Sequence, residues 1–333
     1  MIQDAEGTIW LGTEKGLFRS SENGGELAFS SVDIGLRANE SKYVYELYED
    51  RRGAVWVGTA NSLARISGDN RVTVFHNEDD AVFFQEMLED GAGNFWVGSY
   101  KKGLFKFTVD ENDAPKIVKQ FAAAPNSELE DVDAIEESSG GKLWIGGSNG
   151  LYEFEPAANK LLRYTRTSGL NYYRFQTLFE DRAGNLWLGF SVQGFGRIRS
   201  GRFEFFGDEQ NVPTGGVSNL FFDRENRLWI ALRQGGVLRI DDAEADTLDF
   251  VNYTEANGLS SNRTLSLTQD RQGFIYVGTD REYKSPESAD ARNQTAQTSR
   301  QSTSARISLG GLRRGRHALV RHDGRFSQIR SDI

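Results

Sequence analysis

The sequence predicts an all-β fold, a seven-bladed β-propeller of four-stranded antiparallel blades, because one short motif returns seven times along the chain. The motif starts with Asp-x-x-Gly and continues with a Trp between aliphatic residues and then a Gly, as in Asp50 to Gly58. Its aromatic residue recurs at intervals of 46, 40, 48, 43, 42 and 47 residues, which is the length of one blade. The seven copies carry Trp10, Trp56, Trp96, Trp144, Trp187, Trp229 and Tyr276.

Each position of the motif has a structural reason. Asp at the first position and Gly at the fourth favour a tight turn, which we expect to join strand A of a blade to strand B. In strand B, the Trp packs a large apolar surface against the next sheet, and the following Gly leaves room for close approach. Helical repeats of similar length would need apolar residues three to four positions apart, and these short runs bounded by glycine lack that spacing.

The other strands of a blade are expected around the motif. Strand C follows a polar loop, as at Gly103 to Phe107 and Gly236 to Ile240, and the outer strand D follows at Phe203 to Phe206 and Phe250 to Tyr253. The innermost A strands precede the motif at Val44 to Tyr48, Phe83 to Leu88, Val132 to Ile135, Phe175 to Phe179, Val217 to Phe222 and Thr264 to Leu267. A single blade cannot bury both of its faces, so stability must come from its neighbours and from closure of the ring.

The pattern breaks after Thr279. We therefore predict a propeller over residues 1–283, and a disordered insertion or tail over residues 284–310, which are rich in Ser, Gln, Thr and Arg. Residues 311–333 have the form of a β-hairpin that turns near Asp323 and Gly324. This hairpin is expected to supply strands C and D of the seventh blade, and a frameshifted stretch is the alternative interpretation.

Composition excludes several classes of protein. The net charge is -9, and residues 284–333 hold ten Lys and Arg against four Asp and Glu, so residues 1–283 carry -15. An acidic disk does not suggest nucleic acid as the main partner. The absence of cysteine excludes disulfides and thiolate chemistry, and no apolar run is long enough to span a bilayer. The first residues lack the pattern of a signal peptide, and we interpret the chain as a fragment.

The motif, the Gly-Leu-x-(Arg/Lys) of strand C and linkers such as Tyr253 to Leu259 resemble the two-component-regulator propeller repeat over residues 1–279. In that family, propellers form the ligand-sensing, usually periplasmic, part of bacterial hybrid histidine kinases and of some sensor diguanylate cyclases. The resemblance implies a sensor, although the chain contains no kinase, cyclase or transmembrane segment. The copies depart from the pattern at Ser138, Asn226, Ala231 and Tyr276.

Most residues that could suggest chemistry have a structural interpretation. The recurrent Asp residues are expected to be turn residues and not catalytic carboxylates or calcium ligands, and the Trp residues to be core and not a sugar-stacking platform. Gly194-Phe-Gly196 lacks the third glycine and the βαβ unit of a dinucleotide site. His76 has no acid-base partner in the sequence and is expected at the surface end of a D strand. The acidic cluster does not fit a calcium loop and is expected to form a solvated or channel-facing edge. Its members are Glu128, Glu130, Asp131, Asp133, Glu136 and Glu137.

The loops from strand D to the next A and from B to C differ between copies, and unequal loops on a repeated scaffold are where specificity can reside. Their aromatic, amide and guanidinium groups suit a sugar or another polar small molecule, neutral or anionic. Tyr172, Tyr173, Arg174, Tyr100 and Arg233 are the strongest candidates. The full predicted ligand-binding set is Tyr43, Asn61, Tyr100, Lys101, Asn149, Tyr172, Tyr173, Arg174, Gln193, Arg233, Gln234, Asn262 and Arg263, and Asn39 lies in the same group of loops.

The predicted function is therefore that of a non-enzymatic ligand-sensing propeller of a bacterial receptor, with polysaccharide fragments as the ligand class that the resemblance implies. No cofactor, metal or catalytic residue is predicted. Expected partners are a small-molecule or oligosaccharide ligand and a homodimer formed through the full-length receptor, and the implied location is periplasmic. The alternatives are a propeller lyase resembling the streptogramin lyases, which the scarcity of histidine disfavours, and a protein-interaction platform.

Overall fold

The computed structural model describes residues 1–23, 26–77, 82–121, 129–164, 170, 174–213, 215–269, 273, 275–280, 317–322 and 325–330. For residues 22, 23, 26, 27, 317–322 and 325–330 it describes the backbone alone. The predicted insertion at 284–310 lies outside the described residues. The described part is all-β apart from two short 3-10 helices, η2 (Asp208–Gln210) and η3 (Glu255–Asn257). No helix in these ranges has the length and apolarity needed to cross a bilayer.

Six antiparallel sheets of four strands follow the order of the sequence, and we call them blades 1 to 6. Blade 1 contains β1 (Ile2–Gln3), β2 (Ile9–Thr13), β3 (Gly16–Asn23) and β4 (Glu26–Val32). Blade 2 contains β5 (Val44–Glu49), β6 (Val55–Thr59), β7 (Ser62–Ile66) and β8 (Val72–His76). Blade 3 contains β9 (Phe83–Glu89), β10 (Phe95–Tyr100), β11 (Gly103–Val109) and β12 (Pro115–Phe121).

The remaining blades repeat this plan. Blade 4 contains β13 (Ala134–Glu137), β14 (Leu143–Gly147), β15 (Gly150–Glu155) and β16 (Lys160–Tyr164). Blade 5 contains β17 (Phe175–Glu180), β18 (Leu186–Phe190), β19 (Phe195–Arg199) and β20 (Arg202–Phe206). Blade 6 contains β21 (Val217–Phe222), β22 (Leu228–Leu232), β23 (Gly236–Ile240) and β24 (Val251–Tyr253).

The seventh sheet departs from this plan. It contains β25 (Thr264–Gln269), β26 (Ile275–Thr279), β27 (His317–His322) and β28 (Arg325–Arg330), in the order β25-β26-β28-β27. The structure thus gives six blades of the predicted type and not seven. The hairpin was predicted to continue the sheet with its first strand, whereas its second strand, β28, pairs with β26. Its position is not fixed by a tight turn, because residues 280–316 separate β26 from β27.

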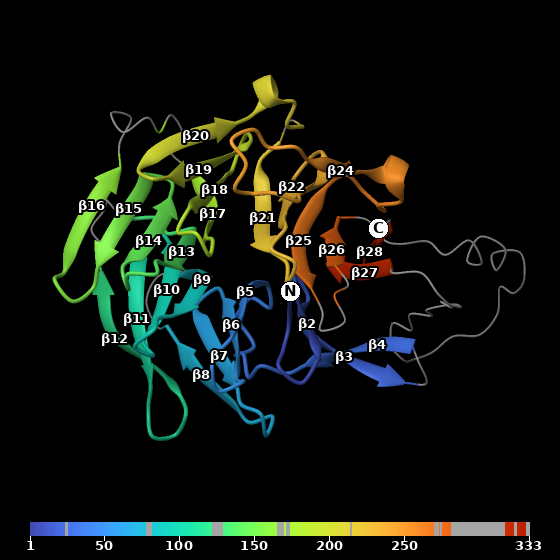
Figure 1. The fold of residues 1–333 in the computed structure, drawn as a ribbon. Coiled ribbons are helices and arrows are strands. Elements are labelled where there is room, and N and C mark those ends of the chain that lie inside the picture. The colour runs from blue at the N-terminus through green and yellow to red at the C-terminus, as the bar shows by residue number, and fades with distance from the viewer. Residues whose placement is uncertain are drawn as a thin grey trace, which may run out of the picture.

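The sheets are arranged in a ring, with their first strands around the axis (Figure 1). The first strands of successive sheets contact each other, from β1 through β5, β9, β13, β17 and β21 to β25, and β25 also contacts β1. The outer strands β8, β12, β16 and β20 lie at the periphery (Figure 1). The loops from each fourth strand to the next first strand therefore meet the loops between second and third strands at one end of the axis. We call this end the loop face.

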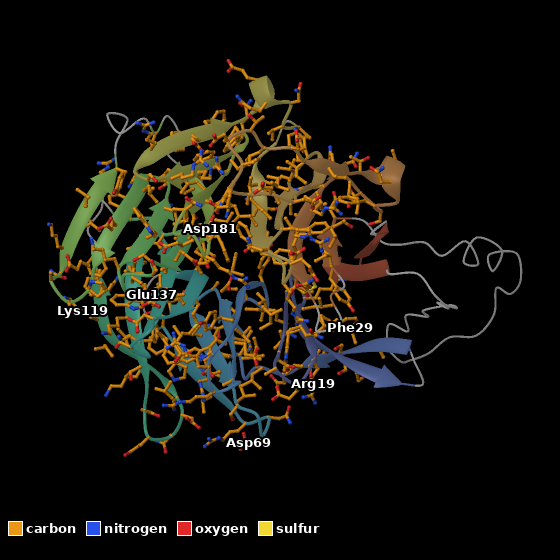
Figure 2. All side chains as sticks on the ribbon, in the orientation of Figure 1. Arg19, Phe29, Asp69, Lys119, Glu137 and Asp181 are labelled. Atoms are coloured by element: carbon orange, nitrogen blue, oxygen red, sulfur yellow. The ribbon has the colours of Figure 1, made fainter. Side chains whose placement is uncertain are left out.

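The motif tryptophans form the core between sheets, as predicted. Trp56, Trp96, Trp187 and Trp229 are each at most 1% exposed, and each packs with apolar residues of the following sheet. Side chains fill the space between neighbouring sheets (Figure 2). The motif glycine provides the predicted clearance, because a Cβ atom at Gly98 would lie 2.6 Å from Val132 Cγ1 of blade 4. Apolar burial between sheets therefore holds each blade to the next.

The motif aspartate does more than close the turn. In blade 5, Asp181 Oδ1 accepts hydrogen bonds from the Ala183 and Asn185 amides, and Oδ2 accepts one from Trp187 Nε1 at 2.8 Å. The Arg197 side chain, opposite Trp187 on β19, stacks over the indole with its guanidinium carbon 5.3 Å from the ring centroid. The spacing of Asp and Trp therefore satisfies an indole N–H that would otherwise be buried without a partner.

Blade 4 shows what happens when the aspartate is absent. Ser138 takes its place, and the Trp144 indole donates to Glu180 of blade 5 at 3.4 Å instead. The residue opposite Trp144 is Glu153 in place of the usual Arg or Lys, and Lys142 pairs with Glu153 at 2.5 Å. Trp144 is only partly buried, in contrast to its counterparts. The two substitutions, Ser138 and Glu153, therefore belong together, as one altered polar arrangement around the same tryptophan.

Candidate functional site

Four aromatic rings form a continuous row on the loop face, across blades 2 and 3. Tyr43 stacks on Tyr45 with centroids 4.4 Å apart, and Tyr45 meets the edge of Phe83 at 5.4 Å. Phe83 in turn meets Tyr100 at 6.0 Å, and Lys101 Nζ lies 4.9 Å from the Tyr100 ring centroid. Tyr45 is 38% exposed, so this row presents aromatic surface to solvent. We call Tyr43, Tyr45, Phe83 and Tyr100 the aromatic row.

The aromatic row contains two residues that the sequence did not point to. Tyr45 and Phe83 were assigned to innermost strands, where successive side chains point to opposite faces of the sheet. The pairing of β5 with β6 shifts register between Val44 and Glu46, which brings Tyr45 out of the regular alternation. A bulge of this kind re-aims a side chain and leaves little signal in a single sequence.

Three arginines gather on the opposite side of the loop face. Arg174 precedes β17, Arg233 follows β22, and Arg263 precedes β25, so each comes from a different sheet. Partial removal from solvent, together with repulsion from Arg174 and Arg263, lowers the pKa of Arg233. Arg233 therefore lies close enough to both Arg174 and Arg263 to be affected by their charges, although their loops are far apart in sequence.

The partners of these arginines differ. Arg174 Nε lies 3.2 Å from Asp133 Oδ2, and Arg263 lies 3.7 Å from an Asp280 carboxylate oxygen. Arg233 donates to Gln176 Oε1 at 2.6 Å, which is a neutral acceptor. In the described part of the chain, no carboxylate lies within ion-pair distance of Arg233. We call Arg174, Arg233 and Arg263 the arginine cluster.

A cavity of about 370 Å³ opens beside the arginine cluster, between blade 6 and the seventh sheet. Its lining includes two predicted residues besides Arg263, namely Gln234 and Asn262. Two carboxylates, Glu255 and Asp280, also contribute to its wall. The cavity is therefore polar and mixed in charge, with its positive side toward the arginine cluster.

Several predicted asparagines form hydrogen bonds within the loops. Asn61 adopts a left-handed backbone conformation with φ 66°, and its Oδ1 accepts the Val82 amide at 2.6 Å. Asn262 Oδ1 accepts the Glu255 amide at 2.7 Å. The backbone carbonyl of Asn149 accepts a hydrogen bond from Arg163 Nη2 at 2.8 Å. These contacts fix the shapes of the loops, and a ligand contact by any of these three residues remains a prediction.

Three other predicted residues complete the set. Gln193 lies in the turn between β18 and β19 and is partly buried. Tyr172 and Tyr173, two of the strongest candidates from sequence, lie outside the described residues. Apart from Asn149 and Gln193, the described predicted residues thus fall into two groups, one around the aromatic row and one around the arginine cluster.

Carboxyl groups lie on the first strands of blades 2, 3 and 4, which are strands around the axis. Burial raises the pKa of Glu46 to about 8 and that of Glu136 to about 7, and burial with repulsion from Glu46, Glu136 and Asp133 raises the pKa of Glu86 well above its usual range. Asp133 and Glu136 belong to the predicted acidic cluster, while Glu137 accepts the Gly91 amide and Glu128 lies outside the described residues. Among the described side chains, no three acidic or histidine groups are placed to hold a metal ion.

The prediction that His76 has no acid-base partner was wrong. Glu40 Oε1 lies 2.9 Å from His76 Nδ1, and the Ser62 hydroxyl lies 3.2 Å from the same nitrogen. Ser62 also donates to Glu40 Oε1 at 2.8 Å. Both partners use one ring nitrogen, so the imidazole cannot pass a proton between them as in a Ser-His-acid triad. The three side chains instead tie β8 to β7 and to the loop before β5, and the sequence distance of 36 residues between Glu40 and His76 concealed the pair.

Comparison with known proteins agrees with the fold. A catalytically inactive virginiamycin B lyase from Staphylococcus aureus matches at a TM-score of 0.62 and 14% identity, covering 83% of this chain and 89% of that one. A streptogramin B lyase matches at 0.59 and 14% identity, covering 83% and 91%. At these identities the similarity concerns the fold alone. No curated protein matches the chain in sequence.

An extracellular domain assigned to a one component system of B. thetaiotaomicron matches at a TM-score of 0.44 and 16% identity, covering 81% of this chain. The chain spans 50% of the length of that domain and 46% of a related one. The family described as two component regulator propeller matches residues 40–61 and 258–281. These segments run from the loops before β5 and β25 into the second strands of their sheets, where the repeated motif lies. Two segments of the chain are therefore similar to the repeat of the two component regulator propeller family.

Proposed function

We propose that this chain is the ligand-sensing propeller of a bacterial signal-transduction receptor and that it has no enzymatic activity of its own. The family of its repeats supports this proposal. A ligand that spans the loops of several sheets would bias their relative positions, and the change would pass to an output segment of the full-length receptor, which we expect to act as a homodimer. The proposed location is periplasmic or extracellular.

The aromatic row carries the proposal that the ligand is a carbohydrate or another polar small molecule. Sugar rings stack on exposed aromatic faces through their C–H groups, while amide and charged groups around them bind hydroxyls. Tyr45, at 38% exposure, offers such a face, with Tyr43 stacked on it at 4.4 Å. Lys101, the amides of the loops and the arginine cluster supply polar groups within the same loop face.

A panel of neutral and acidic oligosaccharides, tested by thermal shift and calorimetry, provides the experiment. We expect at least one oligosaccharide to bind, and Tyr45→Ala to weaken its binding by about 10-fold, equivalent to about 1.4 kcal/mol. Leu162→Ala is the matched control, because it removes an exposed apolar side chain from the outer strand β16. A folded protein that binds no member of the panel would refute the carbohydrate proposal.

The two alternative functions receive less support. Streptogramin-type lyases use a histidine-centred site, whereas His76 lies on the outer strand β8 and has both partners on one nitrogen. A protein-interaction platform would be favoured by co-purification of a partner in the absence of any small ligand.

We also propose that the seventh sheet acts as a seventh blade that closes the ring, with residues 1–283 and the hairpin within 311–333 forming one propeller and residues 284–310 forming an insertion. Contacts of β25 with β21 and with β1 support the position of this sheet between blades 6 and 1. Limited proteolysis tests the division: cuts confined to 284–310, with the last twenty residues or so protected, are expected. Loss of the whole tail would contradict it.

A further inference from the structure

We infer that the arginine cluster is an oxyanion subsite, which binds a carboxylate, sulfate or phosphate group of the ligand. The inference rests on the proposed function, because it assigns a chemical group to the ligand of the same loop face. Arginines of three different sheets lie around Arg233, in a protein whose net charge is -9: the Arg233 side chain bonds Gln176, two residues after Arg174, and Arg263 lines one cavity together with Gln234. Bringing like charges together costs free energy unless an anion compensates them.

Carboxylates of the protein neutralise the positive charge of the arginine cluster only in part. Asp133 lies 3.2 Å from Arg174 and its charge also acts on Arg233, while Asp280 lies 3.7 Å from Arg263. Arg233, whose charge is felt by both neighbours, donates to the neutral Gln176 Oε1. A guanidinium group has five N–H donors in a planar fork that matches two oxygens of a carboxylate, sulfate or phosphate. An oxyanion placed at Arg233 would therefore receive direct hydrogen bonds and relieve the repulsion of the two flanking arginines.

The surroundings limit where the anion can lie. Glu255 and Asp280 line the cavity beside Arg263, so an anion deep in that cavity would meet negative charge. On the side of Arg233 that faces Arg174, the hydrogen-bond acceptor is the neutral Gln176 of β17, and the nearby Asp133 carboxylate is already paired with Arg174. The subsite is thus centred on Arg233, and the rest of the ligand extends across the axis toward the aromatic row.

The test uses four probes on the folded chain at matched, low ionic strength: inorganic sulfate, inorganic phosphate, glucuronate and neutral glucose. We expect at least one of the three anions to bind, and the anion that binds best identifies the group. Arg233→Gln should raise its dissociation constant about 10-fold or more, and added sodium chloride should weaken binding. Arg52→Gln is the matched control, since it removes the same charge from an exposed position on the turn between β5 and β6, at the opposite end of the axis.

Failure of this inference is distinguishable from failure of the proposed function. Absence of binding by all three anions, or equal weakening by Arg233→Gln and Arg52→Gln, would overturn the subsite. If neutral oligosaccharides still bind and Tyr45→Ala weakens their binding, the sensor proposal holds without the oxyanion subsite.

Discussion

The motif aspartate has three kinds of hydrogen-bond partner in blade 5, which explains why one residue type recurs at that position. Asp181 is 7% exposed and accepts bonds from backbone amides of its turn, from Asn185 Nδ2 and from the Trp187 indole. Charged acceptors form stronger hydrogen bonds than neutral ones, and a buried donor that loses its acceptor pays the full cost of desolvation. The carboxylate thus couples the turn, strand B and the core in one residue.

Asp181→Ala is therefore expected to lower the free energy of unfolding by about 2–4 kcal/mol, since it leaves the indole and two amides without acceptors. Ser138→Ala is the matched control at the same position of blade 4. Ser138 Oγ accepts only the Lys142 amide in the described structure, and Trp144 donates elsewhere, so about 1 kcal/mol or less is expected. Urea unfolding followed by tryptophan fluorescence measures both. Equal losses in the two variants would contradict the role given to the carboxylate.

Glu136 predicts a pH dependence. Burial raises its pKa to about 7 from an ordinary value of 4.5. Between these two values the unfolded chain ionises the group while the folded protein keeps it protonated, so its contribution to stability falls as pH rises and levels off above about pH 7. Glu136→Gln keeps an acceptor for the Glu180 amide, at 3.0 Å in the wild type, and removes the titration. The variant should match the wild type near pH 4.5 and exceed it by about 1–3 kcal/mol at pH 8.

Urea unfolding of both proteins at several pH values between 4.5 and 8 measures this difference. Glu14→Gln, in the exposed turn between β2 and β3, is the control and should change stability by about 0.5 kcal/mol or less at any of these values. A difference between Glu136→Gln and wild type that does not grow with pH would contradict the burial of this carboxyl.

At the scale of elements, neighbouring sheets are joined by one repeated polar contact. At five of the six boundaries from blade 1 to the seventh sheet, the amide that follows the first motif residue donates to a side chain at the end of the next first strand. Examples are Arg51 to Glu89 at 2.8 Å and Arg224 to Gln269 at 3.0 Å. Between blades 5 and 6 the corresponding residue is Phe222, which stacks on Phe179 at 5.2 Å and contacts Trp187. A polar contact at some boundaries and an aromatic contact at another therefore connect neighbouring sheets at equivalent positions.

Gln269 accepts the equivalent amide hydrogen bond from Arg224. Glu89→Gln should therefore leave the free energy of unfolding nearly unchanged, whereas Glu89→Ala should lower it by about 1 kcal/mol. The alanine variant leaves the Arg51 amide without its acceptor in the adjacent blade. Comparison of the two variants by chemical denaturation separates the loss of the acceptor from the loss of the charge. If Glu89→Gln is as destabilised as Glu89→Ala, the ionic character of the contact matters and the amide is not its main partner.

The elements were predictable from sequence to the extent that their signals are local. The Trp and Gly of the motif lie on one short strand, so their burial and close packing could be predicted. Burial is confirmed for five of the six tryptophans, and close packing is confirmed at Gly98. The bond from Asp181 to Trp187 spans six residues and could have been found from the fixed spacing. The convergence of Arg174 and Arg233 depends on the ring as a whole, and the exposure of Tyr45 depends on a bulge. Neither leaves a signal in a single copy of the repeat.

At the scale of the whole molecule, the order of strands in the seventh sheet determines how the ring can close. β26 is antiparallel to β28, and β28 is antiparallel to β27, so β26 and β27 run in the same direction. Strands that run in the same direction need a crossover of about a dozen residues or more, whereas antiparallel neighbours need only a tight turn. Residues 280–316, which separate β26 from β27, are numerous enough for such a crossover. The predicted order β26-β27-β28 would not require a crossover.

Shortening this connection therefore tests the closure of the ring. Replacement of residues 281–314 by a turn of about four residues should prevent the observed strand order, so we expect faster amide exchange in β25, β26 and the adjoining β1 and β2. Blades 3 to 5, across the ring, should keep their protection, because each sheet depends mainly on its neighbours. A Gly/Ser linker of about 15 residues at the same place is the control and should retain protection close to that of the wild type. If the four-residue turn protects β26 as well as the linker does, the hairpin pairs in the sequential order, and the seventh sheet closes the ring as a regular blade.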